Sequence, residues 1–107
     1  MQDRRMFERF NVNFPVRFGV LDSNKEGSGR IVDISASGGG LIVTKEQLNP
    51  ATSLELWLQI PDNKEPFHTT GKVVWSSMIE PETYRVGVQF DELDLMGLSR
   101  VLKYKDK

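Results

Sequence analysis

The sequence predicts a small, mainly β domain, a six-stranded antiparallel barrel followed by one C-terminal helix. Apolar and polar residues alternate along several segments with the period of two that half-buried strands show. Turn signals rich in Gly, Pro, Asn and Asp separate these segments at short intervals, as they do in small barrels. Near the end of the chain the apolar spacing changes to three and four, which is typical of a helix. A length of 107 residues predicts a single domain.

The strands follow from the apolar pattern. Alternation is clear in three segments and shorter in three others, so we expect strands at residues 12–20, 30–34, 40–44, 54–60, 70–75 and 84–90. Pro15 lies inside the first of them and has no amide hydrogen to donate to a neighbouring strand. We therefore expect an edge or a β-bulge at that point.

The C-terminal segment predicts a helix over about 91–104. Its apolar residues recur on one face: Leu95, Leu98, Val101 and Leu102. Asp91 or Asp94 is suited to cap the first turn, and Lys103 and Lys105 place positive charge near the negative end of the helix dipole. We expect this helix to cover the open side of the barrel.

Composition excludes several classes of function. The 14 basic and 15 acidic residues give a formal net charge of -1, which does not favour coating of DNA or RNA through many phosphate contacts. The absence of cysteine excludes disulfides and thiolate chemistry. No apolar stretch is long enough for a membrane span, and the start lacks a signal-peptide pattern, so we expect a cytoplasmic protein without membrane insertion.

Two short strings carry most of the recognition chemistry. The polar residues 1–11 form a predicted N-terminal arm, ahead of a barrel and helix spanning 12–107, and the arm holds Arg5 and Arg9 four residues apart. The second string, residues 33–38, offers a carboxylate, a hydroxyl and a flexible turn. Guanidinium groups pair with phosphate in two-point contacts, and a carboxylate accepts hydrogen bonds from the N–H edge of guanine. The two strings together indicate a ligand that carries both phosphate and guanine.

Catalytic motifs are missing from the sequence. Gly71 and Lys72 do not form a phosphate-binding P-loop, because the residues around them break its spacing. No serine lies in a nucleophile-elbow string. Glu80 and Glu82 flank a proline in an apparent exposed loop, where nothing raises a carboxyl pKa for acid catalysis. With His68 as the one histidine, we expect neither an enzyme nor a metal site.

The two strings and the strand pattern resemble the PilZ domain family, which combines an RxxxR motif in an N-terminal arm with a [D/N]xSxxG motif on a six-stranded barrel. The residues that carry the resemblance are Arg5, Arg9, Asp33, Ser35 and Gly38. Residues 71–75 and 86–90 also resemble the closing strands of the family. The resemblance covers about residues 4–90 and implies a PilZ-type barrel that binds cyclic di-GMP (c-di-GMP) as a ligand, with no other cofactor.

The resemblance also implies which residues bind the ligand: Arg4, Arg5, Arg9, Asp33, Ser35, Gly38, Gly39 and Trp75. The arginines grip phosphate or the O6/N7 edge of guanine, and Asp33 accepts from guanine N1–H and N2–H. Ser35 reaches a polar edge or a phosphate oxygen, and Gly38 allows a positive φ or close approach of the main chain. Trp75 either presents its indole to a base or belongs to the core.

Stoichiometry and partners are further implications. Arg4 stands just before the first motif, where an arginine favours two c-di-GMP molecules per chain. Ligand binding is expected to order the arm and to change a surface that an unidentified downstream protein reads. Two alternatives remain: a protein-docking module of the same fold with weak or no nucleotide binding, and a small oligonucleotide-binding barrel, supported by Trp57 and Trp75 but opposed by the net charge.

Overall fold

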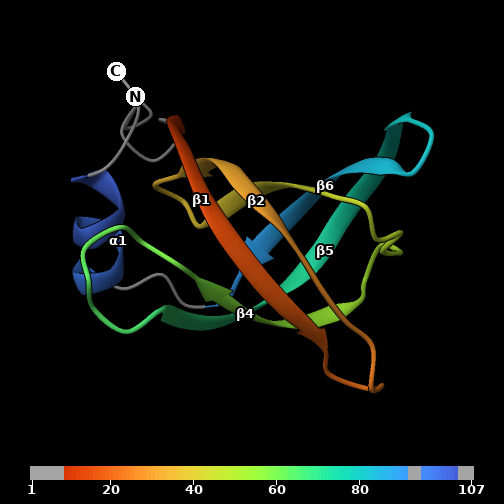
Figure 1. Cartoon of the computed structure of the whole chain (residues 1–107), viewed down its shortest axis with the longest axis horizontal. Helices are drawn as coiled ribbons and strands as arrows, with labels where there is room; N and C mark the ends of the chain where they lie inside the picture. The colour runs from red at the N-terminus through yellow and green to blue at the C-terminus, as the bar shows by residue number, and fades with distance from the viewer. Residues whose placement is uncertain (1–8, 92–94, 104–107) are drawn as a thin grey trace, which may run out of the picture.

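A computed structural model describes residues 9–91 and 95–103 (Figure 1). They form six strands and one helix. The elements are β1 (Arg9–Val20), β2 (Glu26–Ser35), β3 (Gly39–Thr44), β4 (Ser53–Leu58), β5 (Phe67–Glu80), β6 (Thr83–Phe90) and α1 (Leu95–Leu102). In the described part of the chain, no helix is both long and apolar enough to cross a membrane.

The strands close into an antiparallel barrel in the order β1-β2-β3-β6-β5-β4. Closure depends on β1, which pairs with β2 along one edge and with β4 along the other. This confirms the predicted all-β class with one short helix. Pro15 lies beside the expected irregularity: the β1–β2 register shifts between Asn11 and Phe14, and pairing with β4 begins only at Val16.

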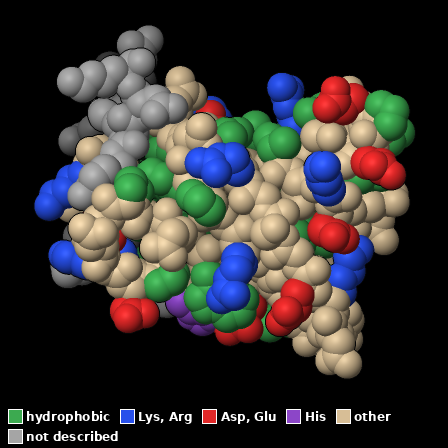
Figure 2. Space-filling model, in the orientation of Figure 1, with side chains coloured by type: hydrophobic (Ala, Val, Ile, Leu, Met, Phe, Trp, Pro, Cys, Tyr) green, Lys and Arg blue, Asp and Glu red, His purple; other side chains and the backbone are tan. Residues whose placement is uncertain are grey.

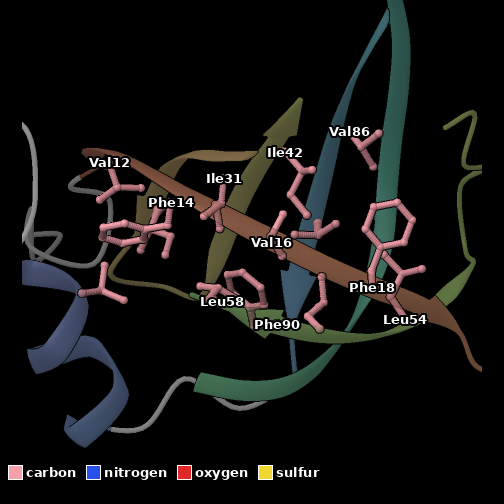
Figure 3. Close-up of a cluster of buried hydrophobic side chains, with 14 of the residues drawn as sticks. Val12, Phe14, Val16, Phe18, Ile31, Ile42, Leu54, Leu58, Val86 and Phe90 are labelled. Atoms are coloured by element: carbon pink, nitrogen blue, oxygen red, sulfur yellow. The ribbon is translucent and has the colours of Figure 1, made fainter. Parts of the chain in front are cut away.

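The core is built from the inward residues of the alternating segments. On β1 the inward side chains are Val12, Phe14, Val16 and Phe18, each at most 2% exposed. Figure 3 shows them in one line along the strand, facing inward side chains of the other strands. Because one side chain in two points inward along a strand, the period of two in the sequence becomes one apolar barrel interior.

Helix α1 lies over one end of the barrel (Figures 1 and 3). Val101 is fully buried there. Arg100 forms a two-point ion pair with Asp62 in the β4–β5 connection, with Nε 2.7 Å from Oδ2 and Nη2 3.0 Å from Oδ1. Arg100 Nη2 also donates to the carbonyl of Glu65 over 2.8 Å. The helix is therefore fastened by both apolar burial and a charged hydrogen-bond pair.

Helix α1 is described from Leu95, whereas the prediction began it at about residue 91. Asp91, one of the two predicted caps, is engaged with β5. Its Oδ2 accepts a hydrogen bond of 2.7 Å from Thr70 Oγ1, and its N–H donates to the Thr70 carbonyl over 2.9 Å. The alternative cap Asp94 and the terminal Lys105 lie outside the described residues.

Several strand boundaries differ from the prediction. Strand β2 begins at Glu26, four residues before the predicted start, and β4 ends at Leu58, two residues before the predicted end. Strand β1 begins at Arg9, so residues 9–11 of the predicted arm are paired with β2. Strand β5 is 14 residues long, whereas only residues 70–75 were predicted. Two bulges, at Val74 and Ile79, break the β5 alternation and hide the strand from a period-two pattern.

Candidate functional site

The turn between β2 and β3 is organised by Ser35. The Ser35 carbonyl accepts from Gly38 N–H over 3.0 Å, and its Oγ accepts from Gly39 N–H over 2.9 Å. The same Oγ lies 3.0 Å from the hydroxyl of Ser37. Ser35 is only 3% exposed. The structure therefore places this predicted ligand-binding hydroxyl inside the turn, where it holds the loop in shape.

Gly38 occupies a backbone conformation that other residues rarely adopt. Its φ is 97°, and a Cβ at this position would lie 2.9 Å from Nε2 of Gln89. Gln89 Nε2 donates to the Ser37 carbonyl over 3.1 Å, and Phe90 N–H donates to the Gly38 carbonyl over 2.8 Å. These bonds tie the turn to the end of β6. At Gly39, a Cβ would lie 3.1 Å from Ser35 Oγ, so both glycines keep the turn compact.

The two sequence strings meet at an ion pair between Arg9 and Asp33. Arg9 Nε lies 2.8 Å from Asp33 Oδ1, and the two side chains are 56% and 18% exposed. The contact arises because β1 and β2 are antiparallel, with Asn11 opposite Asp33. Oδ1 itself is buried and accepts no regular hydrogen bond from the described residues. The Arg9 guanidinium thus faces this oxygen as an ion-pair partner, and the Asp33 side chain remains partly exposed beside it.

Trp75 lies on the outer surface of the barrel. It is 45% exposed and stands opposite Gly87 on β6. A Cβ on Gly87 would lie 2.3 Å from Trp75 Nε1, so the indole rests directly over this glycine. The structure thus resolves the open question about Trp75: the ring packs on the outside of the sheet and is not part of the core.

Asp33 and Trp75 belong to one row of residues across four strands. The pairs are Asp33 with Leu41, Leu41 with Gly87, and Gly87 with Trp75. We call this set, Asp33, Leu41, Gly87 and Trp75, the Asp33–Trp75 row. It places a carboxylate and an aromatic ring on the same outer face, about three strand spacings of 4.8 Å apart.

The other predicted site residues are Arg4 and Arg5, which lie outside the described residues. Sequence reasoning missed Gly87 and Gln89, which shape the site without being part of either motif. Gly87 carried a usable signal. A glycine between Val86 and Val88 inside an alternating strand often marks a close approach by another group.

A second aromatic cluster lies on the β1–β4–β5 side of the barrel. The Arg17 guanidinium is 5.5 Å from the Trp57 ring centre, and the His68 ring is 5.4 Å from it. His68 Nε2 also pairs with Glu55 Oε1 at 2.7 Å. A cavity of about 460 Å³ borders Glu55 and Trp57. Among the described residues, no group of three or more His, Cys, Asp or Glu side chains is arranged to hold a metal ion.

Charged side chains of both signs are dispersed over the face of the molecule in Figure 2. Figure 2 shows Lys and Arg side chains intermingled with Asp and Glu, without a continuous basic stripe on the face in view. A protein that tracks a nucleic-acid backbone concentrates positive charge along a groove. The surface in Figure 2 does not have that character.

The family of the chain follows from comparison with known proteins. The PilZ domain model matches residues 3–104. A comparison with curated proteins gives no match. Among solved structures, the PilZ domain with c-di-GMP of YcgR from Escherichia coli is 17% identical with a TM-score of 0.70, over 95% of this chain and 92% of that one.

Two longer proteins contain the same fold. The inhibitor of motility MotI/DgrA of Bacillus subtilis is 18% identical with a TM-score of 0.70, over 97% of this chain and 50% of that one. The MrkH–c-di-GMP complex of K. pneumonia is 22% identical with a TM-score of 0.62, over 96% of this chain and 51% of that one. The chain thus spans about half the length of each. The structural similarity supports the fold, and the family match over residues 3–104 confirms the predicted resemblance: the chain belongs to the PilZ domain family.

Proposed function

We propose that this chain is a c-di-GMP receptor domain and not an enzyme. The observation that carries the proposal is the meeting of the two family motifs at Arg9 and Asp33, on a face that also holds the Trp75 indole. Solved relatives of the same fold, the YcgR PilZ domain and MrkH, are described with c-di-GMP. A receptor for an intracellular nucleotide acts in the cytoplasm.

Each described residue has a chemical role in this proposal. The Asp33 carboxylate, whose side chain is 18% exposed, accepts from guanine N1–H or N2–H. Arg9 is 56% exposed and donates to phosphate or to the guanine O6/N7 edge. Trp75 stacks on a base. Ser35, Gly38 and Gly39 hold the turn that supports Asp33, and Gly38 keeps the main chain close to the ligand.

The arm completes the site in the proposal. Arg4 and Arg5 join Arg9 around the phosphates, and Arg4 favours binding of two c-di-GMP molecules. Ordering the arm costs about 1–2 kcal/mol per residue. A charge-assisted hydrogen bond contributes about 1.5–3 kcal/mol. Several arginine contacts must therefore form together, so ligand binding and ordering of the arm are coupled.

The role of a docking module is supported by a separate observation. Val74, Met78 and Ile79 on β5 are 57%, 61% and 45% exposed, an unusual concentration of apolar surface for one strand. At the upper right of Figure 2, the end of the β5–β6 hairpin shows hydrophobic side chains beside acidic ones. Val74 directly precedes Trp75 in the chain, so a partner that docks at Val74 is placed to sense the ligand-bound state.

Calorimetry with c-di-GMP tests the receptor function. We expect the wild type to bind in the micromolar range or tighter, and Asp33→Ala to bind about 10- to 100-fold more weakly, because the acceptor for the guanine N–H edge is removed. Asp22→Ala, which removes an exposed carboxylate in the β1–β2 turn, is the matched control and should bind like the wild type. The proposal is contradicted if the wild type does not bind c-di-GMP but does bind single-stranded oligonucleotides at physiological salt.

A further inference from the structure

A second outward row lies next to the Asp33–Trp75 row and carries two arginines. It consists of Arg30 on β2, Val43 on β3, Arg85 on β6 and Ser77 on β5, and we call it the arginine row. On β3, β6 and β5 its members stand two residues from those of the Asp33–Trp75 row. Side chains two residues apart point to the same face of a strand, so both rows lie on one outer surface.

Strand geometry sets the dimensions of this surface. Two residues along a strand span about 6.6 Å, and strands lie about 4.8 Å apart. The backbones of Arg30 and Arg85 are therefore separated by about 10 Å across β3, within reach of two long side chains that converge on one anion. Both arginines are exposed, and Val43 between them is half-buried.

Arg30 is already held in position. Its Nε donates to Asn13 Oδ1, and its Nη2 donates to the Asn13 carbonyl over 3.2 Å. These contacts restrain the guanidinium against β1 without neutralising it, because the asparagine carries no charge. A cation fixed in advance loses less side-chain entropy when it binds an anion than a free one does.

Arg85 has no acidic neighbour in the sheet. The residues opposite it are Val43 and Ser77, and the diagonal neighbours in the Asp33–Trp75 row are Leu41 and Trp75. The ion pairs of the described residues are Arg9–Asp33, Lys25–Glu46, His68–Glu55 and Arg100–Asp62. Neither arginine of the arginine row takes part in them, so this patch keeps its positive charge.

From this arrangement we infer that Arg30 and Arg85 form a second anion subsite of the same face, which binds a phosphodiester of c-di-GMP that Arg9 does not reach. The inference rests on the proposed function. The ligand has two phosphodiesters in one ring and two guanines. With a guanine held at Asp33 and stacked on Trp75, one phosphodiester faces the Arg9 end of the site and the other faces the arginine row.

The test compares c-di-GMP with the linear dinucleotide GpG, which has a single phosphodiester. Calorimetry is performed on the wild type, Arg85→Ala, Arg85→Gln and Arg30→Gln. The control is Arg17→Ala, which removes an exposed arginine on the Trp57 side of the barrel. We expect the two Arg85 variants to bind c-di-GMP at least about 10-fold more weakly and to bind GpG within about twofold of the wild type. Arg30→Gln should likewise bind c-di-GMP more weakly and GpG with nearly wild-type affinity. Arg17→Ala should bind both ligands with wild-type affinity.

The outcomes separate the two proposals. A wild type that does not bind c-di-GMP refutes the receptor function. A wild type that binds it, with an affinity that Arg85→Ala and Arg85→Gln leave within twofold, refutes only the second subsite. If the Arg85 variants lose the same factor of affinity for c-di-GMP and for GpG, the subsite is also refuted, because Arg85 would then not act on the second phosphodiester. Circular dichroism and the melting temperature of each variant verify that the barrel is intact.

Discussion

Replacing Gly87 by alanine should separate the stability of the barrel from binding at its outer face. A Cβ built at Gly87 lies 2.3 Å from Nε1, 2.5 Å from Cε2 and 2.8 Å from Cδ1 of Trp75. Real Cβ atoms do not approach so closely, and the contact is with the ring itself. The indole must therefore move off the sheet. Trp75 is 45% exposed, so the ring is free to swing into solvent without disturbing the core.

The magnitudes of the two effects differ. Base stacking on an aromatic side chain contributes about 1–3 kcal/mol, so loss of the Trp75 platform should weaken c-di-GMP binding about 5- to 150-fold. Stability should change little. The lost packing of a half-exposed ring is offset by the lower backbone entropy of alanine in the unfolded chain, about 0.4–1 kcal/mol. We expect the melting temperature to stay within about 5 °C of the wild type.

The assay combines fluorescence with calorimetry in a Trp57→Phe background, so that Trp75 is the single tryptophan. Gly87→Ala should shift Trp75 emission to longer wavelength and weaken c-di-GMP binding. Gly19→Ala is the matched control, because a Cβ at that β1 glycine meets nothing within 4 Å. If Gly87→Ala matches Gly19→Ala in both emission and affinity, the indole neither rests on Gly87 nor contributes to binding.

Two further predictions concern the turn and the helix. Gly38→Ala should lower the free energy of unfolding by about 1–2 kcal/mol in urea titrations, because alanine at φ 97° is strained and its Cβ crowds Gln89; an unchanged urea midpoint contradicts this account. The charged hydrogen bonds from Arg100 lower the pKa of Asp62 from 3.8 to about 2, so the folded state favours the carboxylate. The stability that this pair contributes is fully present above about pH 4 and is lost as the pH falls towards 2. In Asp62→Asn, the urea midpoint of unfolding should therefore depend less on pH between about 4 and 2 than it does in the wild type.

The parts of the fold that could be predicted are those in which local pattern and packing agree. Phe14, Val16 and Phe18 alternate with exposed residues on β1, and Leu54, Leu56 and Leu58 do so on β4. Burial of one face is enough to produce this pattern. The need for a glycine at Gly38 was also predictable, since its positive φ is a local backbone property.

Element ends were less predictable because long-range contacts decide them. Asp91 suits a helix cap in the sequence, but in the fold its carboxylate is engaged with Thr70, 21 residues away. Likewise, Arg9 reads as part of a free arm, yet it pairs with Ser35 in the β1–β2 ladder and contacts Asp33. Nothing in the sequence next to Asp91 or Arg9 indicates that these side chains contact distant residues and not solvent. Local propensity therefore could not predict the contacts.

The orientation of Trp75 shows most clearly why the site itself was not predictable. Val73 points into the core and is 1% exposed, so strict alternation along β5 places Trp75 inside as well. The bulge at Val74 inserts one extra residue opposite β6 and reverses the phase, which turns the indole outward over Gly87. One unpaired valine thus decides whether the barrel gains a core residue or a binding platform. A Val74 deletion removes the extra residue and leaves Trp75 directly after the inward Val73, so period-two alternation should keep the indole outward over Gly87. In a Trp57→Phe background its emission should therefore match that of the same protein with Val74 present, and a strong shift to shorter wavelength would contradict this account of the bulge.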